Sequence, residues 1–227
     1  MDYRTEKDSM GDVKVPQDAL YGAQTQRAVD NFRFSDRRLP PGFIHRLALI
    51  KAAAARANLE LELISKEVAI AIMGAAESIA RGEHDNQFPV DVFQTGSGTS
   101  TNMNMNEVLA TLASESLGEA VHPNDIVNMS QSSNDVIPTC IHVSSALDLE
   151  QQLIPAAERL RGTILEKGRE LKDTVKTGRT HLMDAMPLTF EQELSGWAWQ
   201  IGESVERMND LLERHKEYPP GGTAVGT

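Results

Sequence analysis

Two long segments of this chain carry apolar residues at alternating three- and four-residue steps, a spacing typical of amphipathic helices with a narrow apolar seam. The seam of the first segment consists of Leu153, Ala157, Leu160, Ile164, Leu171 and Val175. The seam of the second consists of Leu194, Trp197, Ile201, Val205, Met208 and Leu212. Two such helices cannot bury their seams alone, so we expect further helices, from this chain or from partner chains, to complete a bundle.

The rest of the chain also favours helices. Residues 43–64 form an alanine-rich apolar-periodic segment, and Ser65 is a candidate N-cap for another helix that ends before Gly82. Residues 1–42 show several breakers and little periodicity, which predicts an irregular arm with a strand or hairpin around residues 13–20. The predicted fold class is therefore mainly α.

Composition narrows the classes of partner. The 227 residues have a formal net charge of -11, which disfavours nucleic acid and anionic membranes because both attract basic faces. No apolar run approaches the length of a membrane span, and the polar start is unlike a signal or transit peptide. The single cysteine, Cys140, excludes an internal disulfide and fits a reducing compartment. We expect a cytoplasmic protein, although a processed organellar protein would have the same composition.

A stretch rich in glycine, hydroxyls and amides runs from Gln94 to Glu107, before a predicted helix over residues 108–117. Glycines let the backbone approach a ligand, and the free amides of a helix N-terminus favour an anion. The stretch lacks the Gly-Lys-Ser/Thr ending and the strand context of a phosphate loop. We therefore favour an anion site of another kind, the alternative being a flexible loop with an elaborate N-cap.

Two shorter polar clusters follow. Residues 122–125 read His-Pro-Asn-Asp, and their His and Asp are metal-ligand types. No third ligand stands at a recognised spacing, so no metal site is expected. Residues 130–135 read Ser-Gln-Ser-Ser-Asn-Asp and contain nothing apolar to bury. They form either a solvated loop or a cluster that faces a ligand.

The two long helical segments flank a polar stretch from Gly178 to Pro187 that holds a guanidinium, a hydroxyl, an imidazole and a carboxylate. Glycine and proline at its ends predict a loop between the two helices. Histidine is the side chain best suited to transfer a proton near neutral pH, so His181 is a candidate acid or base. A surface or structural histidine is the alternative.

Three of these stretches occur in a fixed order: residues 96–107, residues 132–135 and residues 178–181, with the turn at 122–125 between the first two. Their combination resembles the fumarase/aspartase superfamily and, within it, the class II fumarases, which need no iron. The similarity extends from Met10 to the Gly-Gly-Thr-Ala-Val-Gly-Thr that ends the chain. It therefore covers nearly the whole sequence.

The aspartate ammonia-lyases resemble the chain through the same stretches. They carry Gln and Thr where this sequence has His181 and Ser133, so both positions favour the fumarases. The chain departs from the fumarase pattern at Ile126, at Met183 and at Phe190-Glu191. The first departure weakens the turn at 122–125 as a ligand site, while the others leave the reactive groups in place.

The resemblance implies a small N-terminal domain, residues 1–131, followed by the first long helices of a central helical bundle, residues 132–227. It implies that the remaining bundle helices, a C-terminal domain and a Gly-Ser-Ser…Met-Pro-Gly-Lys loop are absent. The serine of that loop is the base that removes the C3 proton of malate. On this interpretation the chain is an inactive fragment of a homotetramer whose active sites each draw on three subunits.

The activity implied by the resemblance is the reversible hydration of fumarate to (S)-malate in the tricarboxylic acid cycle, with no metal or other cofactor. His181 corresponds to the acid/base that acts on the water. The implied substrate-binding residues are Ser97, Gly98, Thr99, Ser132, Ser133, Asn134 and Thr180. A second, non-catalytic dicarboxylate site is implied at His122, Asn124 and Asp125. The alternatives are an aspartate ammonia-lyase-like enzyme and a non-catalytic helical assembly module.

Overall fold

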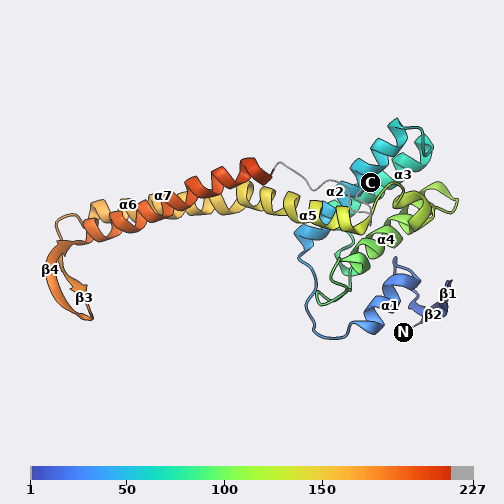
Figure 1. The fold of residues 1–227 in the computed structure, drawn as a ribbon, viewed down its shortest axis with the longest axis horizontal. Coiled ribbons are helices and arrows are strands. Elements are labelled where there is room, and N and C mark those ends of the chain that lie inside the picture. Colours follow the sequence, from blue (N-terminus) through green and yellow to red (C-terminus); the bar gives the residue numbers. More distant parts are fainter. Residues whose placement is uncertain (1, 216–227) are drawn as a thin grey trace. The chain divides into compact units, whose positions relative to one another are not determined.

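The computed structural model describes residues 2–215, and most of these residues lie in seven α-helices (Figure 1). The prediction of a mainly α fold is confirmed. The described residues form two compact units, residues 2–144 and residues 145–215, and each unit is described by itself. The predicted domain boundary after residue 131 concerns the complete protein and stays a prediction. The glycine-rich stretch at residues 221–227 lies outside the described residues.

The first unit begins with a hairpin of β1 (Tyr3–Asp8) and β2 (Gly11–Pro16), followed by α1 (Ala23–Asn31). The prediction of an irregular arm with a hairpin near residues 13–20 was wrong in extent, since the hairpin already begins at Tyr3. Strand β1 reads Tyr-Arg-Thr-Glu-Lys-Asp and has no apolar alternation that would reveal a strand. The Arg4 guanidinium helps to fix the hairpin, because it donates to the carbonyl oxygens of Pro16, Ala19 and Tyr21 at 2.9, 2.7 and 2.8 Å.

Three helices form the core of this unit: α2 (Pro41–Glu60), α3 (Lys66–Ala80) and α4 (Thr99–Leu117). The largest apolar side chains buried between them are Leu47, Ile72, Ile79, Met105 and Leu109. The predicted N-cap of α3 is confirmed, because the Ser65 hydroxyl accepts a hydrogen bond from the backbone N–H of Val68 at 3.3 Å. A short 3₁₀ turn, η1 (Asp85–Gln87), lies between α3 and α4.

Helix α4 begins at Thr99, nine residues before the predicted start at residue 108. Its first half therefore contains residues 99–107 of the polar stretch, which were predicted to precede the helix. Asn102, Asn104 and Asn106 are buried in this helix, and the side-chain amide of Asn104 donates to the backbone oxygen of Gln87 at 3.0 Å. These tertiary hydrogen bonds offset the weak helix propensity of asparagine.

Glu107 of α4 caps the N-terminus of α1. Its carboxylate accepts hydrogen bonds from the backbone N–H groups of Gly22, Gln24 and Thr25 at 2.9, 2.9 and 3.1 Å. The N-cap residue of α1 is Gly22, whose lack of a side chain leaves these donors without a local acceptor. One buried carboxylate therefore ties the arm to the core and neutralises the positive end of α1.

Replacing Glu107 by alanine should lower the free energy of unfolding by about 3 kcal/mol, because three N–H groups near the core lose their acceptor together. Chemical denaturation of the purified protein measures this change. Glu115→Ala is the matched control, since Glu115 is exposed on the same helix and its loss should change stability by less than about 0.5 kcal/mol. Equal effects of the two substitutions would contradict the capping role.

The segment after α4 contains η2 (Pro123–Val127), a single π-helical turn, and then α5 (Ser133–Asp148). The predicted onset of helix near residue 141 was therefore late, because the hydroxyl-rich residues that start α5 carry no apolar periodicity. A second π-helical turn, η3 (Leu149–Leu153), precedes α6 (Ile154–Glu170). Pro155 lies at the second position of α6, directly after η3.

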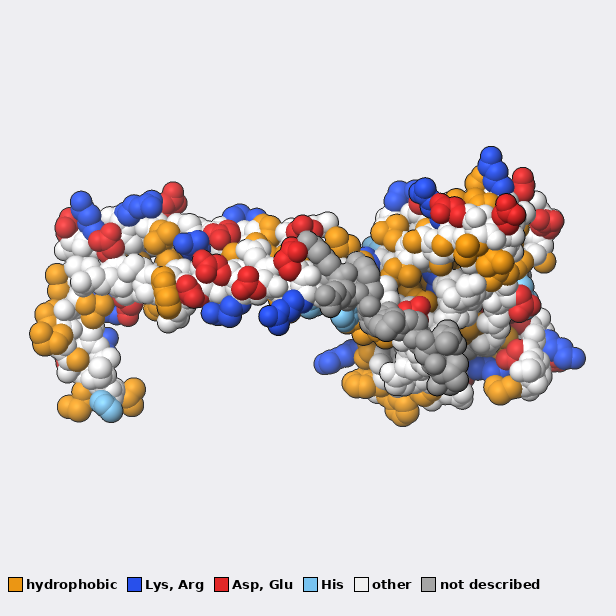
Figure 2. Space-filling model, turned by 45° about the horizontal axis from the view of Figure 1, so that its top comes forward, with side chains coloured by type: hydrophobic (Ala, Val, Ile, Leu, Met, Phe, Trp, Pro, Cys, Tyr) orange, Lys and Arg blue, Asp and Glu red, His pale blue; other side chains and the backbone are white. Residues whose placement is uncertain are grey.

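The second unit consists mainly of α6 and α7 (Phe190–His215), joined by a hairpin of β3 (Val175–Thr180) and β4 (Met183–Thr189). The two helices bury Gly168, Ala198, Gly202 and Val205 between them. Much of the predicted seam stays half-exposed in this unit, as Leu160 and Trp197 retain 54% and 51% of their accessible surface. Figure 2 shows hydrophobic side chains interspersed with charged ones on the surface. Within residues 2–215, no helix has an apolar stretch long enough to cross a membrane.

Candidate functional site

A row of three hydroxyl groups lies at the start of α4. Ser97 Oγ is 2.8 Å from Thr99 Oγ1, which in turn is 2.9 Å from Ser133 Oγ. This hydroxyl row joins two of the polar stretches singled out in the sequence, although Thr99 and Ser133 are 34 residues apart. Ser97 and Thr99 are exposed, so the row can exchange its internal hydrogen bonds for bonds to a ligand.

Gly98 sits inside the hydroxyl row as the N-cap of α4. Its φ of 68° lies in the left-handed region, and a Cβ at this position would come within 3.0 Å of the Ile137 side chain. Both facts require glycine here. The absent side chain lets the backbone of residues 97–99 approach α5 closely, and the first turn of α4 contains no acidic residue that would repel an anion.

The N-terminus of α5 lies next to the hydroxyl row at the start of α4. The backbone oxygen of Ser132 accepts from Asp135 and Val136 at 3.1 and 2.9 Å, and Ser132 Oγ accepts from the Asn134 N–H at 3.3 Å. Residues 132–134 are thus the cap and first turn of α5, with Ser133 in contact with Thr99. Two helix N-termini, each rich in hydroxyl and amide donors, converge on one small polar surface that suits a carboxylate.

Thr180 and His181 belong to the second unit, so they are described apart from the hydroxyl row. The predicted loop from Gly178 to Pro187 was wrong, because these residues form most of the β3–β4 hairpin. Thr180 pairs with Met183 at the end of the strands, and His181 and Leu182 form the two-residue turn. Both turn residues have left-handed backbone angles, with φ values of 50° and 61°, as a type I′ hairpin turn requires.

The β3–β4 hairpin has a bulge at Gly178, where the strand register shifts between Thr177 and Arg179. A Cβ on Gly178 would lie 2.6 Å from the backbone oxygen of Met186, so only glycine allows the strands to approach here. At the tip, Leu182 is fully exposed and the His181 imidazole is exposed beside it. The hairpin therefore presents an accessible imidazole at the end of a short two-stranded ribbon.

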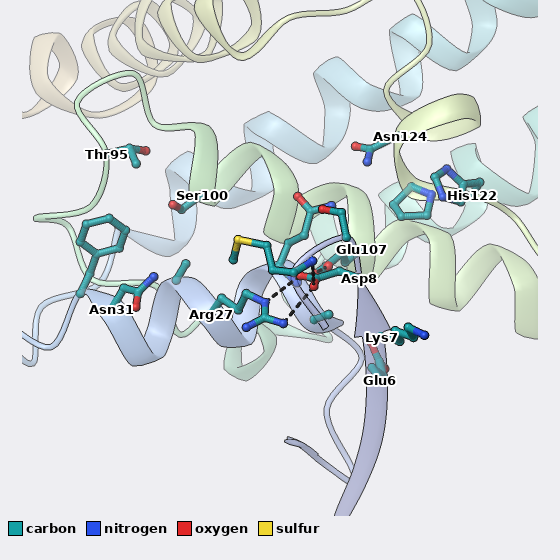
Figure 3. A pocket seen from close by; sticks show the side chains of 17 residues that line it. Glu6, Lys7, Asp8, Arg27, Asn31, Thr95, Ser100, Glu107, His122 and Asn124 are labelled. Atoms are coloured by element: carbon teal, nitrogen blue, oxygen red, sulfur yellow. Dashed lines mark hydrogen bonds and ion pairs between the residues drawn. The ribbon is translucent and has the colours of Figure 1, made fainter. Parts of the chain in front are cut away.

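His122 and Asn124 line a cavity of about 700 Å³ in the first unit (Figure 3). Asp125 does not line it. Instead, the backbone N–H of Asp125 donates to His122 Nδ1 at 3.1 Å, so that His122 caps the π-helical turn η2. The structure thus brings two of the three residues of the implied second dicarboxylate site to one cavity, together with hydroxyls such as that of Ser100.

The positive charge in this cavity comes from Lys7 and Arg27, and the carboxylates of Glu6, Asp8 and Glu107 also line it (Figure 3). Arg27 Nε and Nη2 donate to the two carboxylate oxygens of Asp8 at 2.8 and 2.9 Å. These hydrogen bonds lower the pKa of Asp8 and raise the pKa of Arg27. The guanidinium is therefore already paired, so an anion that enters the cavity has to compete with the Asp8 carboxylate or bind to the neutral donors.

Sequence analysis missed a buried polar network next to the hydroxyl row. Lys51 of α2 is fully buried, and its ammonium donates to Asn128 Oδ1 at 3.0 Å and to Gln131 Oε1 at 2.9 Å. A signal was present, because Lys51 follows Leu47 by four residues and Asn58 follows Lys51 by seven, which places both on the apolar face of the helix. Polar residues at such positions indicate a buried hydrogen-bonded network.

Comparison with known proteins assigns the family. A family model described as "Lyase" matches residues 11–227.

The chain belongs to this lyase family.

Two similar relatives are named as class II fumarate hydratases. The chain is 57% identical to a class II fumarate hydratase of Xylella fastidiosa over 225 residues, which are 99% of this chain and 48% of that protein. It is 52% identical to "Fumarate hydratase class II 2" of Pseudomonas aeruginosa over 226 residues, 100% of this chain and 49% of that protein. The chain thus spans about half the length of these relatives.

A solved structure of the lyase family has the same fold. The recombinant class II fumarase from Schistosoma mansoni matches with a TM-score of 0.93 and 41% sequence identity, over 100% of this chain and 49% of that one. In residues 2–215 of this chain, no group of three or more His, Cys, Asp or Glu side chains is placed to hold a metal ion.

Proposed function

We propose that the complete protein with this sequence is a fumarate hydratase, which catalyses the reversible hydration of fumarate to (S)-malate. The observation that carries the proposal is the hydroxyl row of Ser97, Thr99 and Ser133, where the N-termini of α4 and α5 converge. The names of the two relatives support it. A surface of hydroxyls and free amides suits a small dicarboxylate, because ionised carboxylates only accept hydrogen bonds.

The chemistry needs such donors. Removing the weakly acidic C3 proton of malate generates a dianionic aci-carboxylate, and donors aimed at that developing charge lower the barrier. The proposed donors are Ser97, Gly98, Thr99, Ser132, Ser133, Asn134 and Thr180. Because the chain has a net charge of -11, its overall field repels a dicarboxylate. Substrate binding must then come from donors concentrated at one place, as at the two helix N-termini.

His181 is the proposed acid/base of the reaction. In the dehydration direction the departing hydroxide needs a proton, and in the hydration direction a water must lose one. An imidazole can do both near neutral pH. The His181 side chain is exposed at the hairpin tip. His122, Asn124 and Asp125 are proposed to form a second, non-catalytic dicarboxylate site, of which the first two line the cavity of Figure 3.

The assembly and cellular context are part of the same proposal. Half-exposed seam residues such as Leu160 and Trp197 support a homotetramer in which helices of other subunits complete the bundle. Residues 1–131 would form the N-terminal domain and residues 132–227 the start of the central bundle.

The acidic composition and single cysteine support a cytoplasmic location. The reaction belongs to the tricarboxylic acid cycle, and the proposal includes no metal.

Specificity for hydration tests the proposal. The complete protein should release fumarate from L-malate much faster than from L-aspartate, because an imidazole at residue 181 can protonate a departing hydroxide. Fumarate absorbance follows both reactions in the same buffer. Faster release from aspartate would assign an ammonia-lyase instead, and no release from either substrate by a folded preparation would favour a non-catalytic assembly module.

A further inference from the structure

The buried lysine of α2 binds the segment that leads into the hydroxyl row. Lys51 Nζ donates to the side-chain oxygens of Asn128 and Gln131 at 3.0 and 2.9 Å. A buried ammonium costs several kcal/mol unless its donors are satisfied, and an apolar side chain would fill the same space without that cost. The retention of a lysine therefore points to a role for its hydrogen bonds. We call Lys51, Asn128 and Gln131 the amide clamp.

The amide clamp fixes the backbone of residues 127–131. The Gln131 side-chain amide donates to the backbone oxygens of Val127 and Met129 at 2.9 and 3.2 Å. The Asn128 amide donates to the backbone oxygen of Gln131 at 3.2 Å. Because Lys51 binds the oxygen of each amide, it sets the orientation in which each NH₂ group faces these carbonyls.

Further side chains of α4 and α2 support the clamp. The side-chain amides of Asn102 and Asn106 in α4 both donate to Asn128 Oδ1 at 3.1 Å. Asn58 of α2 donates to the backbone oxygen of Met129 at 3.1 Å. The turn is therefore held from α2 and α4 at once, and α4 is the helix whose N-terminus carries Thr99.

The clamped turn contains a strained residue. Ser130 has a φ of 61°, a left-handed conformation that costs a non-glycine residue about 1 kcal/mol or more. Its neighbours Met129 and Gln131 are both held by the hydrogen bonds just described. Ser130 lies two residues before Ser132 in this turn, so the turn determines where the first turn of α5 begins.

We propose that Lys51 is a positioning residue for the hydration reaction, which orients Asn128 and Gln131 and thereby keeps the Ser133 hydroxyl in contact with Thr99. The inference rests on the proposed function for its catalytic consequence, but its structural part stands independently. The hydrogen bonds of Lys51 Nζ go to Asn128 and Gln131, so Lys51 acts on the hydroxyl row through the turn. A neutral amine retains two N–H groups for the two amide oxygens, so the clamp operates in either protonation state.

A double-mutant cycle in the complete protein tests this role. Lys51→Met should lower kcat/KM for malate by about 10- to 100-fold, mainly through KM, because a substrate-binding hydroxyl is displaced. Ser133→Ala removes that hydroxyl. The double variant should then be no worse than Ser133→Ala alone, since Lys51 would act through a group that is already absent.

Leu47→Ala is the matched control, because Leu47 is equally buried one turn away on the same helix. It should lower stability without changing KM, and any effect on kcat/KM should add to that of Ser133→Ala. Additive effects for Lys51→Met as well would overturn the positioning role and leave only a structural one. If Lys51→Met does not fold, Gln131→Met removes one acceptor of the same clamp at a half-buried position and should give the same non-additivity.

A crystal structure of the Lys51→Met variant separates this inference from the proposed function. The separation of Ser133 Oγ from Thr99 Oγ1, 2.9 Å in the parent, should exceed hydrogen-bond reach, and Ser130 should leave the left-handed region. An unchanged turn and an intact contact would overturn the inference. If the parent protein does not act on malate at all, the proposed function fails, while this structural comparison still decides whether the clamp positions Ser133.

Discussion

Replacing His181 by asparagine in the complete protein should lower kcat for malate dehydration by about 10²–10⁴-fold, the usual loss when a general acid/base is removed. Asparagine keeps a polar side chain that tolerates the left-handed conformation of the hairpin turn, where φ at His181 is 50°. The hairpin should therefore stay folded while the proton transfer is lost. Steady-state kinetics and a thermal melt of the same preparation measure both quantities.

His84→Asn is the matched control for that experiment. His84 is also a partly accessible histidine, but it precedes η1 in the first unit and has no part in the proposed reaction. Its replacement should leave kcat unchanged. Near-normal turnover by a folded His181→Asn variant would refute the proposed role of the imidazole, and equal losses in both variants would indicate a general effect of removing histidines.

Raising the pH from about 6 to about 9 should stabilise the parent protein relative to its Lys51→Met variant by roughly 3 kcal/mol. Burial lowers the pKa of Lys51 from 10.5 to about 7 in the folded protein. Between these two values the unfolded chain holds the proton and the folded chain does not. Unfolding then takes up a proton, so a higher pH makes unfolding less favourable. Below about pH 7 both states are protonated, and the difference between the variants levels off.

Denaturant titrations of both variants at several pH values measure this difference. Cys140 has the opposite effect, because burial raises the pKa of its thiol from 9.0 to about 12. Above pH 9 the unfolded chain loses the thiol proton before the folded chain does, so the free energy of unfolding falls as the pH rises. Both variants contain Cys140, so its contribution cancels in the comparison. Parallel stability curves for the two variants would show that Lys51 keeps its proton in the folded state across this range.

Helices with apolar stripes could be predicted from the sequence, and those held by polar contacts could not. The N-cap at Ser65 and the helices on either side of it follow from local rules that hold here. Helix α4 was predicted to start too late, because Asn102, Asn104 and Asn106 have low helix propensity in isolation. In the folded chain their side chains are buried and hydrogen-bonded. Such partners, distant in sequence, have no local signature.

The β3–β4 hairpin was missed for a different reason. Most residues of β4 are exposed, so the strand has no buried face and no apolar alternation from which it could be recognised. Gly178 and Pro187 were interpreted as loop signals, whereas the structure uses Gly178 at a bulge. The residue types that mark a loop also mark an irregular strand, and only the pairing across the turn distinguishes the two.

The polar stretches of the site could be recognised by their residues, but their geometry could not. Resemblance to the fumarases named Thr99 and Ser133 without giving the 2.9 Å contact between their hydroxyls. Lys51 went unnoticed because one lysine in an alanine-rich helix is normally an exposed residue. Its burial depends on the amides of Asn128 and Gln131, which lie 77 and 80 residues away.

The β3–β4 hairpin holds His181 far from the helices that support it, so a small rotation of the hairpin moves the imidazole by a large distance. Five residue steps from Val175 to Thr180 place the turn about 17 Å from the end of the helices. Catalysis tolerates a displacement of only about 0.5 Å, which at that radius is a rotation of about 2°. At the end of the hairpin next to the helices, Lys176 Nζ donates a hydrogen bond to the carboxylate of Glu193 in α7 at 2.6 Å. At the tip, side chains such as that of Leu182 are exposed. For the proposed acid/base role of His181, angular precision therefore has to come from packing of the ribbon in the complete protein, so substitutions at the exposed Met183 or Met186 should affect the chemistry without touching the reacting groups.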